Sequence, residues 1–224
     1  MERSTEESRL NHAQGLQGLY AITDSGLADR LGLVDQVAEA LQGGARIIQY
    51  RDKQATPQQR RRQASALRTL TRSQRALLII NDDLELARVV GADGVHLGRD
   101  DPPLAEARAR LGPEAIIGVS CYNRLELARQ AQRSGADYVA FGRFFPSRSK
   151  PGAVQAHPEL LRQARRELRL PLVAIGGITP ENGGALITAG ADMLAVIHGV
   201  FGQPDIRLAC AHFRSLFAPE DATP

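Results

Sequence analysis

Short apolar runs recur along the chain, and longer stretches with a helical spacing of apolar residues lie between them. We count eight such runs: LYAIT, RIIQY, ALLII, GVHL, AIIGVS, YVAFG, LVAIG and MLAVI. Successive side chains of a strand point to opposite faces, so a run that is apolar throughout predicts a strand buried on both faces. Such runs are typical of parallel strands covered by helices.

Amphipathic stretches separate these runs and often end at a glycine. We predict helices in particular at 33–42, 57–72, 124–134 and 158–168. A glycine just past a helix can close the last turn in the left-handed conformation. The glycines that follow a helical stretch and precede an apolar run are Gly43, Gly91, Gly135 and Gly190.

Eight strands alternating with helices predict the α/β class and a (β/α)8 TIM barrel in a single domain. The alternative is an open doubly wound sheet, which has fewer strands and usually a glycine-rich turn after the first strand. Here the first run continues into ITDSGLAD, without a GxGxxG pattern. We therefore expect a barrel over residues 17–217, with loose tails at 1–16 and 218–224.

Composition narrows the functional classes. No apolar run approaches the roughly 20 residues of a membrane helix, and the polar start of the chain lacks the apolar core of a secretory signal. The only cysteines, Cys121 and Cys210, are far apart, which favours packing roles and a cytoplasmic location over a disulfide scaffold. The net charge of +3 is scattered and only 4% of residues are aromatic, so nucleic-acid binding is disfavoured.

Polar residues follow the predicted strands, at the end of a barrel where enzymes carry their chemistry. In strand order from the second to the eighth, they are Gln49, Arg51 and Lys53; Asn81, Asp82 and Asp83; His96, Asp100 and Asp101; Ser120 and Cys121; Ser147, Ser149 and Lys150; Gly176 and Gly177; and His198 and Gly199. All seven sets should gather at one mouth of the barrel.

The cations after the second strand predict an anion site. Gln49, Arg51 and Lys53 occupy alternate positions, so their side chains should point the same way. If Arg51 continues a buried strand, its guanidinium would be costly without a compensating charge. A polyanion at the mouth would supply that charge, and arginine with lysine is a common diphosphate clamp, which Lys150 could join.

The acids after the third and fourth strands have two interpretations. Asp82 and Asp101 could lie close together and hold Mg²⁺, which often links one or two carboxylates to substrate phosphates. Aspartates in such positions also cap the following helices, and we expect that role for Asp83 and Asp100.

Glycines after the last two strands predict a second anion site. AIGGIT and VIHG stand where barrels commonly bind a phosphate with bare backbone amides. The alternative for Gly176 and Gly177 is a tight turn that requires positive φ. Two anion sites suggest two phosphorylated ligands and hence a transferase.

Taken together, the segments QYRDK, NDD, HLGRDD, GVS, SRSK, IGGIT and VIHG closely resemble the thiamine phosphate synthase family, over about residues 17–203. The resemblance implies a transferase that joins 4-amino-2-methyl-5-hydroxymethylpyrimidine diphosphate to a thiazole-ethyl phosphate or its carboxylated form. Diphosphate would leave first, and the thiazole nitrogen would attack a pyrimidine-stabilised carbocation. Such chemistry depends on stabilising the charge of the leaving group.

The resemblance also implies roles for individual residues. Catalytic roles fall to Arg51, Lys53, Ser120 and Lys150, and Mg²⁺ would bind Asp82 and Asp101. Substrate contacts fall to Gln49, Tyr50, Arg51, Asp52, Lys53, Asn81, Ser120, Ser147, Arg148, Ser149, Lys150, Gly177, Ile197 and His198. His96 is either part of the pyrimidine pocket or a core histidine. The loop at 146–152 is a candidate lid that excludes water.

The expected partners are small phosphorylated substrates, with no nucleic acid or membrane, and a homodimer is compatible with this reading. The chain departs from the family pattern at Ser147 and Ser149, where threonine is common, and at His198, where serine is common.

Three rival functions remain. A thiazole tautomerase would need a histidine where this chain has Tyr122. A non-catalytic barrel that only binds a phosphorylated ligand would have lost part of the clamp or the acid pair. A Schiff-base aldolase would need a lysine at the end of the sixth strand, whereas Lys150 lies several residues into the loop.

Overall fold

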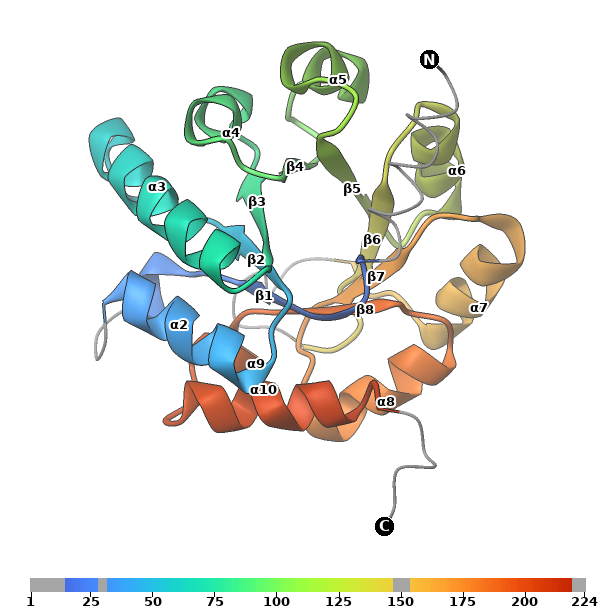
Figure 1. Ribbon diagram of the computed structural model, residues 1–224. Helices are drawn as coiled ribbons and strands as arrows, with labels where there is room; N and C mark the ends of the chain where they lie inside the picture. The colour runs from blue at the N-terminus through green and yellow to red at the C-terminus, as the bar shows by residue number, and fades with distance from the viewer. Residues whose placement is uncertain (1–14, 28–31, 147–153, 219–224) are drawn as a thin grey trace.

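The computed structural model describes residues 15–27, 32–146 and 154–218, and these form a closed barrel of eight parallel strands. Each strand pairs with the next along the chain, and the eighth pairs with the first. Figure 1 shows the strands at the centre and the helices around them. The strands are β1 (Gly18–Ile22), β2 (Ile47–Tyr50), β3 (Leu77–Asn81), β4 (Gly94–Leu97), β5 (Ile116–Tyr122), β6 (Tyr138–Gly142), β7 (Leu172–Ile175) and β8 (Met193–Val196). The predicted (β/α)8 barrel is confirmed.

Helices connect the strands and cover the outside of the barrel. They are η1 (Ser25–Leu27), α2 (Leu33–Gly43), α3 (Pro57–Ser73), α4 (Leu84–Val90), α5 (Leu104–Leu111), α6 (Leu125–Arg133), α7 (Pro158–Glu167), α8 (Pro180–Thr188), α9 (His198–Phe201) and α10 (Ile206–Ser215). The four helices predicted by residue range all form, with ends that differ from the prediction by one residue at most.

The strands separate the apolar core into two layers, as their period of two requires. Alternate residues such as Tyr20, Ile47 and Ile79 point into the barrel and form an inner cluster. Their neighbours, such as Ile48 and Leu78, point outward and pack against the helices. This division explains why the runs are apolar on both faces.

The start of the barrel lies slightly earlier than we predicted. Leu16, which we assigned to the N-terminal tail, is only 2% exposed and belongs to the inner cluster. Of the predicted tails, residues 1–14 and 219–224 lie outside the described residues. No helix in the described part of the chain is long and apolar enough to cross a membrane.

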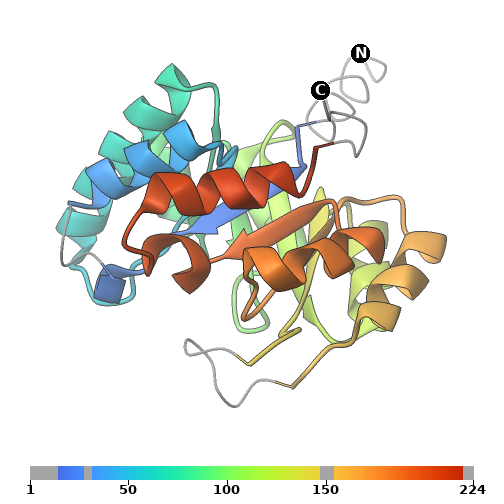
Figure 2. The same ribbon diagram turned by 90° about the horizontal axis from the view of Figure 1, so that it is seen from below.

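The first and last long helices pack closely and close the outer layer. Figure 2 shows α10 running beside α2. A Cβ atom added to Gly43 of α2 would lie 2.4 Å from the carbonyl oxygen of Arg207 and 2.5 Å from Cβ of Cys210, both in α10. Glycine at this position therefore permits the close approach of the two helices.

Helix capping agrees with one of our two predictions. The Asp83 carboxylate accepts the N–H of Leu86 at 2.9 Å and caps α4, as predicted. The prediction for Asp100 is wrong, because α5 begins after Pro103 and has no side-chain cap. Proline has a fixed backbone φ that suits a residue at the start of a helix, so no aspartate is required there.

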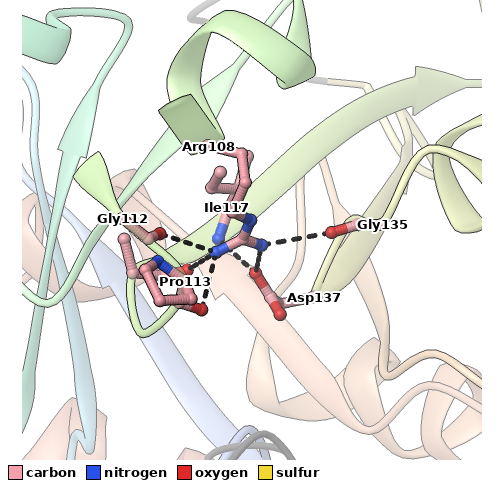
Figure 3. A network of polar contacts seen from close by, with 7 residues as sticks. Arg108, Gly112, Pro113, Ile117, Gly135 and Asp137 are labelled. Carbon is pink, nitrogen blue, oxygen red and sulfur yellow. Dashed lines mark hydrogen bonds and ion pairs between the residues drawn. The ribbon is translucent and has the colours of Figure 1, made fainter. Parts of the chain in front are cut away.

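Arginine–aspartate pairs join neighbouring strands near their amino ends. Three aspartates stand just before β4, β6 and β8, and each accepts the backbone N–H of a residue in the preceding strand. Each also pairs with an arginine of the helix that leads into that preceding strand. The pairs are Arg68–Asp93, Arg108–Asp137 and Arg165–Asp192. Figure 3 shows the second of them, in which Arg108 also donates to several backbone carbonyls.

Candidate functional site

A cavity of about 370 Å³ opens at the carboxyl ends of the strands. All eight strands contribute to its wall. Nine of the lining residues were predicted at strand ends, and these are Gln49, Arg51, Asn81, His96, Ser120, Gly176, Gly177, His198 and Gly199. The remaining wall is largely apolar and includes Ile22, Val173 and Ile175. The predicted convergence on one mouth therefore holds for residues from six of the seven polar strand ends, and the remaining set, after β6, lies outside the described residues.

Five polar side chains form a continuous chain of hydrogen bonds in the barrel interior. Gln49 Nε2 donates to the hydroxyl of Tyr20 at 2.7 Å, and this hydroxyl lies 2.8 Å from that of Tyr138. The Tyr138 hydroxyl lies 3.0 Å from Nδ1 of His96, and Nε2 of His96 lies 2.9 Å from Oγ of Ser120. His96 thus lines the cavity as well as packing on the Tyr138 ring, with 5.6 Å between the ring centroids.

Arg51 lies beyond the end of β2, which stops at Tyr50. Its backbone N–H donates to Oγ1 of Thr23 at 2.9 Å, and the same hydroxyl donates back to the Arg51 carbonyl. The guanidinium is 22% exposed and lies 3.8 Å from the carboxylate of Asp24. The premise that Arg51 continues the buried strand is therefore wrong. The long contact with Asp24 leaves Arg51 able to bind an anion.

Lys53 lies on a second cavity of about 410 Å³ and not on the main one. The alternation of side chains ends with the strand at Tyr50, so the expectation that Gln49, Arg51 and Lys53 share one face is wrong for Lys53. Asn81 lines both cavities, which are therefore adjacent. An elongated anion could span from Arg51 in one to Lys53 in the other.

Tyr50 and Asp52 have local structural contacts. Tyr50 is 2% exposed, and its hydroxyl donates to Oε1 of Gln63 in α3 at 2.6 Å. The carboxylate of Asp52 accepts the N–H groups of Gln54 and Ala55 and shapes the turn before α3. Both residues line the second cavity, so these contacts do not separate them from the site.

Asp82 and Asp101 lie together at the ends of neighbouring strands. Asp82 has a φ of 64°, an uncommon left-handed conformation for a residue other than glycine, and its N–H donates to the His96 carbonyl at 3.0 Å. Burial, together with the adjacent Asp101, raises the pKa of Asp82 to about 6, while Lys53 and Asn81 oppose the shift. The carboxylate of Asp101 accepts the N–H of Gly98.

A divalent cation would fit this pair of acids. Two adjacent carboxylates repel each other when both are ionised, and a bound cation relieves that repulsion. No group of three potential metal-binding side chains of histidine, cysteine, aspartate or glutamate occurs among the described residues. Two carboxylates are nevertheless sufficient for Mg²⁺, which usually keeps several waters and takes further ligands from substrate phosphates.

The glycine-rich turn after β7 lies on the opposite wall of the main cavity. Gly176 and Gly177 both have positive φ, of 106° and 65°. A Cβ atom on Gly177 would lie 2.3 Å from the carbonyl oxygen of Pro146. The turn conformation and the close approach of backbone both require glycine here. Ile197 and His198, at the end of β8, line the same wall.

Four predicted site residues lie outside the described part of the chain: Ser147, Arg148, Ser149 and Lys150. The proposed lid at 146–152 falls in the same segment, apart from Pro146, which lines the main cavity.

Several residues at the site were not predicted from the sequence. Tyr20 lies within the apolar run LYAIT and Tyr138 begins the apolar run YVAFG, so both tyrosines are expected to be buried. A buried tyrosine hydroxyl usually needs a hydrogen-bond partner. That signal could have indicated the hydrogen-bonded chain. Asp24 and Arg143 follow the first and sixth strands closely and could have been found by their position. Arg143 and Tyr122 both line the main cavity.

Comparisons with known proteins agree closely with one another. The family model described as thiamine monophosphate synthase matches residues 19–200. The thiamine-phosphate synthase of Nitrosococcus oceani is 53% identical over 205 residues, which are 92% of this chain and 94% of that protein. That of Thioalkalivibrio sulfidiphilus is 52% identical over 90% of this chain and 96% of its own length. The solved structure of thiamine phosphate pyrophosphorylase from Pyrococcus furiosus has a TM-score of 0.83 at 38% identity, covering 92% of this chain and 96% of that one.

Proposed function

This chain belongs to the thiamine monophosphate synthase family of transferases, which join a pyrimidine and a thiazole into thiamine phosphate, and we propose that the joining takes place in the main cavity. One observation carries the proposal. Arg51 and the turn at Gly176 and Gly177 face the same cavity, so two phosphorylated substrates could bind with their reacting ends toward each other. A single-substrate isomerase would need only one of these anion sites.

The diphosphate of the pyrimidine substrate would extend from Arg51 toward Lys53. The adjacent cavities that these cations line give the diphosphate two positive contacts at different points along its length. Lys150 is proposed as a third cation. Asp82 and Asp101 would hold Mg²⁺, which when bound supplies further positive charge beside the leaving group. Gln49, Tyr50 and Asp52 would support this region through the contacts described above.

The thiazole phosphate would bind at the opposite wall. Gly177, Ile197 and His198 would present backbone N–H groups to the phosphate, as bare backbone does in other barrels. Arg143 lines the same cavity and adds a positive charge there. Ser147, Arg148 and Ser149 are proposed to complete this site.

The pyrimidine would lie between the two anion sites, against Asn81 and Ser120. The bond between its methylene carbon and the diphosphate oxygen breaks, and the electron pair leaves with diphosphate. The thiazole nitrogen then donates its lone pair to the resulting cation. Apolar residues such as Ile22, Val173 and Ile175 restrict water around that cation, which would otherwise be captured by hydrolysis.

A coupling assay tests this function. Purified full-length protein is mixed with the pyrimidine diphosphate and the thiazole phosphate, with Mg²⁺ or with EDTA, and thiamine phosphate is followed as fluorescent thiochrome. We expect product that depends on Mg²⁺. A folded protein that makes no product from either the plain or the carboxylated thiazole phosphate would refute the proposal. Isomerisation of the carboxylated thiazole in the same sample would instead indicate a tautomerase.

Two further predictions concern the cell and the assembly. The cytoplasm is proposed as the location because the substrates and product are charged small molecules of biosynthesis. A homodimer is proposed as the assembly, and sedimentation analysis of the purified protein would test it.

A further inference from the structure

The hydrogen-bonded chain inside the barrel has a direction, which Gln49 sets. Its Nε2 can only donate, so the Tyr20 oxygen accepts that hydrogen. The Tyr20 hydroxyl has one hydrogen, and its other partner among the described side chains is the Tyr138 hydroxyl. Tyr20 therefore donates to Tyr138. Tyr138, having accepted one hydrogen, donates its own to Nδ1 of His96.

This direction defines the protonation of His96. Because Nδ1 accepts a hydrogen bond, it carries no hydrogen, and the ring is the neutral form with its hydrogen on Nε2. That hydrogen is donated to Oγ of Ser120. Ser120 accepts from His96, so its own hydroxyl hydrogen remains available to a group in the cavity that Ser120 lines.

Both tyrosines keep the hydrogens on which this direction depends. Tyr20 and Tyr138 are 1% and 0% exposed, and burial raises the pKa of each above its ordinary value. A charged His96 would donate from Nδ1 to Tyr138, which would then donate to Tyr20. Tyr20 would accept from both neighbours, and its own hydrogen would have no acceptor among the described side chains. Leaving a buried hydroxyl unsatisfied is unfavourable, so the neutral ring is preferred.

We propose that Tyr20 and Tyr138 are positioning residues that hold His96 neutral, with its hydrogen on Nε2, and thereby make the Ser120 hydroxyl a donor to the bound pyrimidine. A ring nitrogen of the pyrimidine is the chemical group that accepts such a hydrogen. A neutral His96 also keeps a positive charge away from the carbocation that forms nearby. The identity of this ligand rests on the proposed function, whereas the state of His96 does not.

Nitrogen NMR of the unliganded, full-length protein tests the state of His96 without any turnover. The protein is labelled with ¹⁵N-histidine, and the His96 signals are identified, among the five histidines, by their loss in His96→Gln. We expect a protonated Nε2 and an unprotonated Nδ1 at neutral pH. A hydrogen on Nδ1, or on both nitrogens, would overturn the proposal, because the chain would then run in the opposite direction.

Steady-state kinetics tests the consequence for the reaction. Tyr138→Phe removes the link between Tyr20 and His96, and we expect kcat/KM for the pyrimidine diphosphate to fall about tenfold, the size of one lost hydrogen bond. KM for the thiazole phosphate should stay within about twofold. Tyr20→Phe breaks the same hydrogen-bonded chain one link earlier, and it replaces Tyr138→Phe in this test if Tyr138→Phe does not fold. Thr71→Val, which removes a buried hydroxyl that donates to the Arg68 carbonyl within α3, is the control and should leave both constants unchanged.

A double variant separates positioning from a general structural effect. If Tyr138 acts through Ser120, Tyr138→Phe combined with Ser120→Ala should be no slower than Ser120→Ala alone. Effects that multiply, or equal losses for both substrates, would refute the positioning role. A wild-type protein that makes no thiamine phosphate would refute the proposed function, while the NMR result would still decide the state of His96.

Discussion

Replacing Arg108 by methionine tests how much the arginine–aspartate pairs stabilise the barrel. Methionine retains most of the apolar stem and removes the guanidinium. The guanidinium lies 2.6 Å from the carboxylate of Asp137 and donates to the carbonyls of Gly135, Gly112 and Pro113 at 3.1–3.3 Å (Figure 3). Because the same carboxylate oxygen also accepts the N–H of Ile117, the acid would stay in place without its counter-ion.

The expected loss follows from the burial of the pair. Removing one partner of a fully buried ion pair costs about 3–5 kcal/mol. Arg108 and Asp137 are 18% and 17% exposed, so water partly replaces the lost charge. Arg108 Nε is also buried without a hydrogen-bond partner in the described structure, a cost that methionine removes. We therefore expect a loss of about 2–3 kcal/mol, or roughly 4–12 °C in Tm for a domain of this size.

Thermal unfolding of Arg108→Met and of the matched variant Arg165→Met tests whether burial governs the contribution of each pair to stability. In Arg165→Met the equivalent pair with Asp192 is 39% and 35% exposed, and we expect a smaller loss of about 1 kcal/mol or less. Unfolding is followed by circular dichroism and by calorimetry, and coupling activity is measured below the transition. Equal shifts in Tm for both variants, or a larger shift for Arg165→Met, would show that burial does not govern the contribution of these pairs.

The remaining predictions concern the site. Arg51→Ala should lower kcat well beyond tenfold, or more than about 1.4 kcal/mol, because the leaving diphosphate loses a cation, and normal turnover would remove Arg51 from the clamp. The pKa of Asp82 is raised to about 6, so the acid is protonated below that pH and ionised above it. Mg²⁺ should therefore raise Tm more at neutral pH than at pH 5, and this difference should vanish in Asp82→Asn. It should persist in Asp83→Asn, which alters the α4 cap and the ion pair with Arg60. Gly177→Ala should raise KM for the thiazole phosphate at least tenfold, since its Cβ would lie 2.3 Å from the Pro146 carbonyl oxygen; an unchanged KM would exclude this turn from the phosphate site.

Local pattern was sufficient to predict the barrel. Strands such as Ile47–Tyr50 are buried on both faces, so their sequences are apolar throughout, and the helices between them show their own period. The closed order of eight strands follows because each strand–helix unit places its strand beside the previous one. The strand ends could also be located, and with them Gln49, Asn81 and Ser120 at the main cavity.

The tertiary structure decided how these residues are grouped. Alternation placed Arg51 and Lys53 together, but it applies only within the strand, which ends at Tyr50, and the turn that follows directs them to adjacent cavities. The pairing of Arg51 with Asp24 likewise depends on how two loops meet.

The hydrogen-bonded chain from Gln49 to Ser120 shows most clearly what the sequence alone could not predict. Its five side chains come from β1, β2, β4, β5 and β6, and they meet only because the barrel closes in one register. The sequence by itself determined that Tyr20 and Tyr138 lie in buried strands, since burial follows from the local apolar pattern. Only the tertiary structure decided that their hydroxyls meet, because hydrogen bonds across the barrel depend on distances between strands that are far apart in the chain.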